Sequence, residues 1–69
     1  MKTTGEKIKD RRLTLKLTQQ ELADRVGVTI RAISGYETGK MKPRGVNLRE
    51  LSHVLGVSEE YLLRDEIED

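Results

Sequence analysis

Residues 18–33 read TQQELADRVGVTIRAI, and this stretch contains two helix starts with only a short connection between them. Thr18 followed by Glu21 has the form of a capping box, in which a hydroxyl caps the helix and a carboxylate reaches back. Thr29 caps the second helix, because an apolar residue stands just before it and another four positions after it. Only Val-Gly-Val at residues 26–28 separates the two helices. The helices must therefore cross sharply, and the second must stand out from the body of the domain.

Similar start signals recur along the chain and predict five short helices, the first over about residues 4–15. The expected cap residues are Thr3, Thr18, Thr29, Asn47 and Ser58. Apolar pairs with the spacing of a hydrophobic staple bracket four of these caps: Leu17 with Leu22, Val28 with Ile33, Val46 with Leu51, and Val57 with Leu62. Glycines stand where helices should end, at Gly27, Gly39 and Gly56, and Pro43 is expected in a loop. Strand signals are absent, so the predicted fold class is all-α.

Helical periodicity also predicts the core. Its expected centre is Ile8, Leu22, Val26, Ile33, Leu48, Leu51, Leu55 and Leu62, with the small Ala23 where two helices approach closely. The expected periphery is Tyr36, Leu17, Val28, Val57 and either Leu13 or Leu15. His53 is expected on the surface.

Length and composition exclude several classes of function. A chain of 69 residues forms one small domain, expected over residues 1–64, followed by an acidic terminus or the start of a linker at 65–69. The absence of cysteine excludes disulfides and favours a cytoplasmic protein. A single histidine is too few for a metal cluster. No apolar run approaches the length of a membrane span. The sequence offers no nucleophile–base pair, so an enzyme is not expected.

Charge is distributed unevenly although the net charge is only +1. Residues 1–45 contain 11 Lys and Arg against 5 Asp and Glu, whereas residues 46–69 contain 2 against 7. This asymmetry favours a basic surface that meets a polyanion, although a helical surface rich in salt bridges would give a similar composition.

The second helix of the central pair has an outward face suited to a DNA groove. At roughly 100° per residue, a helix with Ile33 inward points Arg31, Gly35 and Thr38 outward. Gly35 either permits close approach to DNA or is a tolerated surface glycine. Ile30 lies on the flank, where it either packs against the preceding helix or offers its branched side chain to a thymine methyl.

The chain resembles the phage repressor and Cro-like helix-turn-helix family over about residues 4–63, most closely the amino-terminal operator-binding domains of lambdoid phage repressors. The matching segments are Gln-Gln-Glu-Leu-Ala from residue 19, Val-Gly-Val-Thr from 26, Ile-Ser from 33, Glu-x-Gly-Lys from 37, and the segments 46–52 and 54–63. The resemblance implies a compact five-helix domain with its helix-turn-helix at about residues 18–37. It also implies a partner, double-stranded operator DNA bound by a homodimer, and no cofactor or metal.

The resemblance also implies roles for individual residues. The expected base-reading positions are Thr29, Ile30, Arg31, Ser34 and Gly35, and the expected phosphate contacts are Gln19, Thr38, Lys40, Lys42 and Arg44. Arg31 is expected on a guanine, with a phosphate contact or a solvated side chain as its alternatives. Arg12 and Glu37 are expected to form a structural ion pair. The alternative function is a protein-interaction module such as an antitoxin or adaptor, which an apolar patch around Tyr61, Leu62 and Leu63 would favour.

Overall fold

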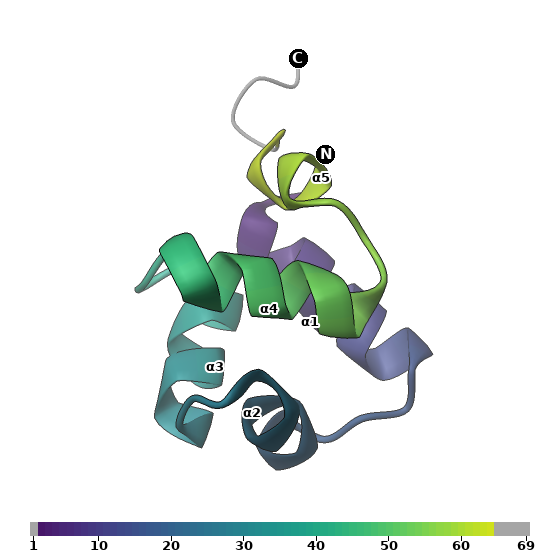
Figure 1. The fold of residues 1–69 in the computed structure, drawn as a ribbon, viewed down its shortest axis with the longest axis vertical. Helices are drawn as coiled ribbons and strands as arrows, with labels where there is room; N and C mark the ends of the chain where they lie inside the picture. The colour runs from purple at the N-terminus through teal and green to yellow at the C-terminus, as the bar shows by residue number, and fades with distance from the viewer. Residues whose placement is uncertain (1, 65–69) are drawn as a thin grey trace.

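Five α-helices make up the described part of the chain, residues 2–64 of a computed structural model, and no strand occurs within that range. The helices are α1 (Thr4–Thr14), α2 (Gln19–Val26), α3 (Ile30–Thr38), α4 (Gly45–Leu55) and α5 (Glu59–Leu63). In Figure 1, α1 and α4 cross the middle of the molecule, α2 and α3 lie at one end, and α5 lies at the other. The all-α, five-helix prediction is confirmed. The terminus or linker expected at residues 65–69 lies outside the described residues.

Four of the five predicted helix caps are confirmed, and two of them are complete capping boxes. The Thr18 hydroxyl accepts from the Glu21 backbone N–H at 3.0 Å, and the Glu21 carboxylate accepts from the Thr18 N–H at 2.8 Å. Thr3 forms the same reciprocal arrangement with Glu6. Thr29 and Ser58 each accept a hydrogen bond from a backbone N–H three residues further on. The connection between α2 and α3 turns at Gly27, whose φ of 89° is a left-handed conformation that glycine adopts at little cost.

The predicted start of α4 is wrong. This helix begins two residues before Asn47, and its N-cap residue Arg44 makes no side-chain cap hydrogen bond. Asn47 instead lies within the first turn and donates from its side-chain amide to the Tyr36 hydroxyl at 3.1 Å. The staple expected between Val46 and Leu51 fails as well, because Val46 is 67% exposed. The Asn47 side chain, which the local pattern predicted as a helix cap, instead forms a tertiary contact with α3.

The core contains all eight residues predicted for its centre together with Ala23. Six side chains are fully buried: Ile8, Leu22, Ile33, Leu51, Leu55 and Leu62. Leu17 and Tyr36, expected at the periphery, belong to the buried cluster, and Val28 and Val57 pack against it. The expectation for Leu13 or Leu15 is wrong, because both leucines are exposed on the last turn of α1 and just after it.

Helix α1 fastens the other helices together through polar contacts as well as through its apolar side. Lys7 donates to the backbone oxygen of Tyr61 in α5 at 2.8 Å, and its ammonium lies over the Tyr61 ring. Arg11 donates two hydrogen bonds to the backbone oxygen of Leu55, the last residue of α4. At Gly5 the backbone of α1 approaches the end of α3 so closely that no side chain fits without a shift. These contacts connect α1 to α5, α4 and α3, and the one at Gly5 sets how closely α3 lies against α1.

Candidate nucleic-acid interface

Helix α3 buries one side and exposes the side predicted to read bases. Ile33 and Tyr36 are buried, whereas Thr29, Ile30 and Arg31 are exposed. Ser34 and Gly35 are half-buried. Ile30 is 44% exposed and is not one of the side chains that pack against the core. Its branched side chain is therefore accessible at the start of the helix.

The surface of α3 at Gly35 is covered by a side chain that sequence reasoning did not single out. A Cβ built at Gly35 would lie 2.8 Å from the sulfur of Met41. The Met41 backbone N–H donates to the Gly35 oxygen at 3.1 Å, which holds the segment after α3 against the helix. The only local signal was a glycine at an outward helical position, and nothing in the sequence pattern connects it with a residue six positions later.

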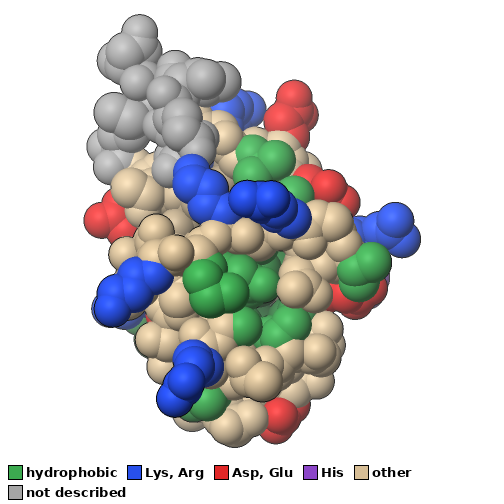
Figure 2. Space-filling model, turned by 90° about the vertical axis from the view of Figure 1, so that its left-hand side faces the viewer, with side chains coloured by type: hydrophobic (Ala, Val, Ile, Leu, Met, Phe, Trp, Pro, Cys, Tyr) green, Lys and Arg blue, Asp and Glu red, His purple; other side chains and the backbone are tan. Residues whose placement is uncertain are grey.

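Several cations lie on the face of the molecule that contains α3. Figure 2, which looks at the side where α3 and the α3–α4 connection lie in Figure 1, shows hydrophobic side chains at the centre with Lys and Arg side chains around them. The predicted phosphate-contacting residues Lys40, Lys42 and Arg44 are all exposed in the connection after α3. Thr38 is also exposed, and its hydroxyl donates to the Ser34 backbone oxygen at 3.0 Å.

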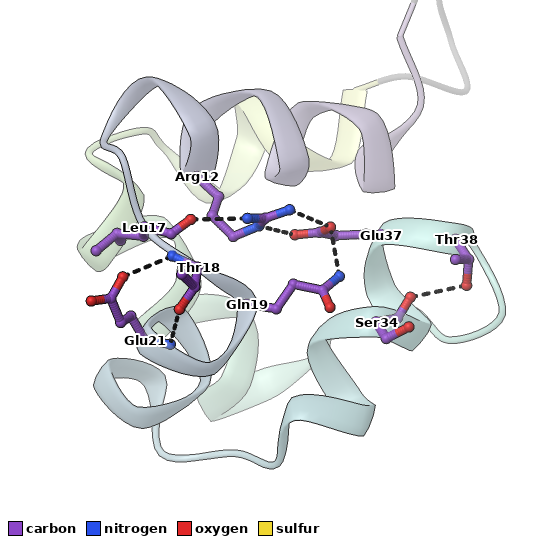
Figure 3. Close-up of polar contacts among 8 residues, drawn as sticks. All are labelled: Arg12, Leu17, Thr18, Gln19, Glu21, Ser34, Glu37 and Thr38. Carbon is purple, nitrogen blue, oxygen red and sulfur yellow. Dashed lines mark hydrogen bonds and ion pairs between the residues drawn. The ribbon is translucent and has the colours of Figure 1, made fainter.

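A buried polar network holds the two ends of the helix-turn-helix to α1 (Figure 3). The guanidinium of Arg12 binds the Glu37 carboxylate through two hydrogen bonds, Nε to Oε2 at 2.7 Å and Nη2 to Oε1 at 3.1 Å. Its Nη1 donates to the Leu17 backbone oxygen at 2.9 Å. Gln19 completes the network by donating from Nε2 to Glu37 Oε1 at 3.1 Å. The ion pair expected between Arg12 and Glu37 is therefore present, with side-chain exposures of 9% and 4%.

This network has two consequences for the surface. Glu37 is the only carboxylate residue between residues 25 and 49, and its pairing removes a charge that would repel phosphates. Gln19 is half-buried, and one of the two N–H donors of its amide is occupied by Glu37. The amide is therefore held in place at the start of α2, beside the end of α3.

Part of the basic excess of residues 1–45 is internal and does not face a partner. Lys7 and Arg12 are buried, and Arg11 is half-buried against the end of α4. Lys2 donates to the carboxylate of Asp10, and this hydrogen bond raises the pKa of Lys2 above its ordinary value. The interpretation of the whole amino-terminal half as a basic working surface is therefore too broad, because α1 uses much of its charge to bind other helices.

Within residues 2–64, no three His, Asp or Glu side chains are grouped as metal ligands, and no pocket occurs. None of the helices is long and apolar enough to cross a membrane. The apolar patch considered around Tyr61 is reduced to Leu63, because Leu62 is fully buried and Tyr61 is half-buried beneath Lys7.

The arrangement of α2, the turn at Gly27 and α3, which exposes one of its sides, is that of a helix-turn-helix. A family model described as helix-turn-helix matches residues 8–62, most of the chain. The chain belongs to this family. The matched region includes α2, α3 and most of the supporting helices, so the network of Arg12, Glu37 and Gln19 lies inside it.

Two relatives are named as a transcriptional regulator and a repressor. The chain is 43% identical over 62 residues to an uncharacterized HTH-type transcriptional regulator, YqaE, of Bacillus subtilis, covering 90% of this chain and 53% of the relative. It is 43% identical over 63 residues to repressor protein C2 of Salmonella phage P22, covering 91% of this chain and 29% of the relative. The chain thus spans about half or less of the length of these two relatives.

Solved structures agree on the fold. The P22 c2 repressor protein in complex with a synthetic operator matches with a TM-score of 0.90 and 42% identity, covering 93% of this chain and 97% of that one. Hydroxypropylphosphonic acid epoxidase from S. wedmorenis matches with a TM-score of 0.76 and 31% identity, but only 32% of that chain is covered. The fold therefore also occurs as one part of an enzyme, so the function must be argued from the surface of this chain.

Proposed function

We propose that this chain is the sequence-specific DNA-binding domain of a transcriptional repressor, with α3 lying in the major groove. The observation that supports it best is the charge of the surface around α3. Arg31 in α3 and Lys40, Lys42 and Arg44 in the connection after it are exposed, and Glu37, the one carboxylate of residues 30–44, is paired with Arg12. A surface of this kind attracts the phosphate backbone, and an α-helix with an exposed side fits the width of the major groove. The similar P22 c2 repressor protein, solved in complex with a synthetic operator, supports DNA binding by this fold.

Within this docking the exposed residues divide into two groups. Thr29, Ile30, Arg31, Ser34 and Gly35 lie on or beside the outward face of α3 and form the base-reading surface. Arg31 has the guanidinium fork that binds guanine O6 and N7, and Ile30 offers an apolar contact to a thymine methyl. Gln19, Thr38, Lys40, Lys42 and Arg44 contact the phosphates on both sides and set the register of the helix.

The protein binds its operator as a two-fold homodimer. A helix-turn-helix reads one half-site, and two copies related by a two-fold axis read a palindrome with half-sites roughly 34 Å apart. Repression follows when the occupied site overlaps a promoter. The isolated domain forms this dimer chiefly on DNA.

Selection of bound sequences from random double-stranded DNA tests the proposal directly. A palindromic consensus with two equal half-sites is expected. Arg31→Ala should relax the preference at one base position in each half-site, because the bidentate contact to that base is lost. Failure to enrich any sequence would contradict sequence-specific binding.

A salt series separates the phosphate contacts from the base contacts. Lys40→Ala should lower the slope of log affinity against log salt by about 1 per bound monomer and weaken all sequences alike. Arg64→Ala is the matched control, because it removes one exposed positive charge at the end of α5, away from α3. An equal loss of slope in both variants would show that overall charge, and not this surface, governs binding. Absence of any salt-dependent binding would favour the protein-interaction alternative.

A further inference from the structure

Met41 lies along the outward face of α3, at the middle of the surface expected to meet bases. A Cβ built at Gly35 would lie 2.8 Å from Sδ, 3.2 Å from Cγ and 3.5 Å from Cβ of Met41. The methionine therefore lies across this position along most of its length. Its backbone hydrogen bond to Gly35 at 3.1 Å fixes where the side chain starts.

Met41 is an exposed apolar side chain next to charged residues. It is 47% exposed and is not part of the core cluster, although its thioether is apolar. Its neighbours in the connection after α3 are the exposed cations Lys40 and Lys42. In Figure 2 hydrophobic side chains occupy the centre of this face, and charged side chains, several of them Lys and Arg, lie around them. A side chain packed only for stability would not need to extend onto the outward side of α3.

We infer that Met41 is a base-reading residue, whose thioether contacts a thymine methyl in the major groove. The inference rests on the proposed docking of α3. The thymine C5-methyl is the apolar group that a major groove presents, and methionine is a flexible, polarisable side chain that adapts to such a surface. Lys40 and Lys42 on either side would bind phosphates and hold the connection against the groove.

Gly35 and Met41 then act as one unit. Any side chain at Gly35 meets the thioether and must push it aside, so glycine is the residue that allows this position of Met41. Gly35 contributes to recognition because its lack of a side chain lets Met41 lie against the backbone of α3. Gly35→Ala is expected to alter recognition of the same base as Met41→Ala, although the two residues are six positions apart.

Replacement of single thymines by deoxyuridine tests the inference, because this change removes only the 5-methyl group. The probe is the consensus duplex enriched by the wild-type protein, with each thymine replaced in turn, and affinity is measured by fluorescence anisotropy. The wild type should bind about fourfold more weakly when the methyl facing Met41 is removed, the value expected for one buried methyl-sized group. Met41→Ala should lose about the same factor on the parent duplex and become insensitive to deoxyuridine at that position.

Matched variants separate Met41 from its surroundings. Met41→Gln keeps the length of the side chain and should also remove the methyl effect, which a purely space-filling role would not predict. Ile30→Ala should alter sensitivity at a different thymine. Leu63→Ala removes another exposed apolar side chain, on α5, and should leave every deoxyuridine penalty unchanged. Circular dichroism melting curves check that each variant is folded.

The possible outcomes distinguish the inference from the proposed function. If Met41→Ala and Met41→Gln keep the wild-type penalty at every thymine, Met41 only covers α3, and the inference is wrong while DNA binding stands. The same conclusion follows if no thymine methyl affects the wild type. If the wild type enriches no sequence at all, the proposed function fails, and the role of Met41 fails with it.

Discussion

Gly5 lies where α1 crosses the end of α3, and its replacement by alanine is expected to destabilise the domain. A Cβ at this position would lie 2.4 Å from the Tyr36 backbone oxygen and 2.5 Å from that of Glu37. Neither oxygen can rotate away, because both belong to the backbone. The helices must separate by about 0.6 Å before the shorter contact reaches 3.0 Å, and a close-packed interior resists such a shift.

The expected magnitude follows from two opposing effects on the free energy of unfolding. Overpacking of this kind costs about 1–3 kcal/mol. Alanine is favoured over glycine within a helix by about 1 kcal/mol, and by less in the first turn where Gly5 stands. The net expectation for Gly5→Ala is a loss of about 1–2 kcal/mol. For a domain of this size, each kcal/mol lowers Tm by about 4–8 °C.

Thermal and urea unfolding followed by circular dichroism measure this change. Gly35→Ala is the matched control, because it makes the same substitution within α3, where the nearest atoms belong to the flexible side chain of Met41. The control should stay within about 1 kcal/mol of the wild type, since Met41 can move and the propensity gain offsets that movement. A Gly5→Ala variant as stable as the wild type, or more stable, would refute the close approach of α1 to α3.

Three further substitutions test other contacts. Glu37→Ala should lower the free energy of unfolding by about 3–5 kcal/mol, because it leaves a buried guanidinium without its partner. The surface control Glu60→Ala should change the free energy of unfolding by less than about 0.5 kcal/mol. An unchanged urea midpoint for Glu37→Ala would contradict the buried pair. Arg11→Ala should cost about 2 kcal/mol by removing the charged donor from the end of α4, yet leave the salt dependence of DNA binding unaltered; a reduced salt slope would assign Arg11 to the interface. Thr18→Ala should cost about 1 kcal/mol in thermal melts through loss of its capping box, and a variant with wild-type Tm would show that this box contributes nothing.

The helix boundaries could be predicted where they depend on neighbours in the chain. Thr3, Thr18, Thr29 and Ser58 cap helices with groups no more than three residues away, so a short sequence pattern contains the whole interaction. The start of α4 could not be predicted in this way. Its apparent cap, Asn47, donates to the hydroxyl of Tyr36 on another helix, and nothing local signals that contact.

The candidate interface could also be predicted only in part. Helical periodicity correctly placed Arg31 and Thr38 on the exposed side of α3 and Ile33 on the buried side. Periodicity assigned Gly35 an outward direction but gave no indication that Met41 covers it. The sign of each charge was visible in the sequence, whereas its use was not: Lys7 and Arg11 contact other helices, and Lys40 faces solvent.

The sequence alone determined the helical class, the central pair of helices with the turn at Gly27, and the centre of the core. These follow from interactions within a few residues and from the period of the helix, both of which are written along the chain. The tertiary structure alone decided that Gly5 must remain small, that Met41 crosses Gly35, and which cations remain at the surface. The physical reason is that these features depend on how two segments cross in space, and the distance along the chain does not encode that crossing.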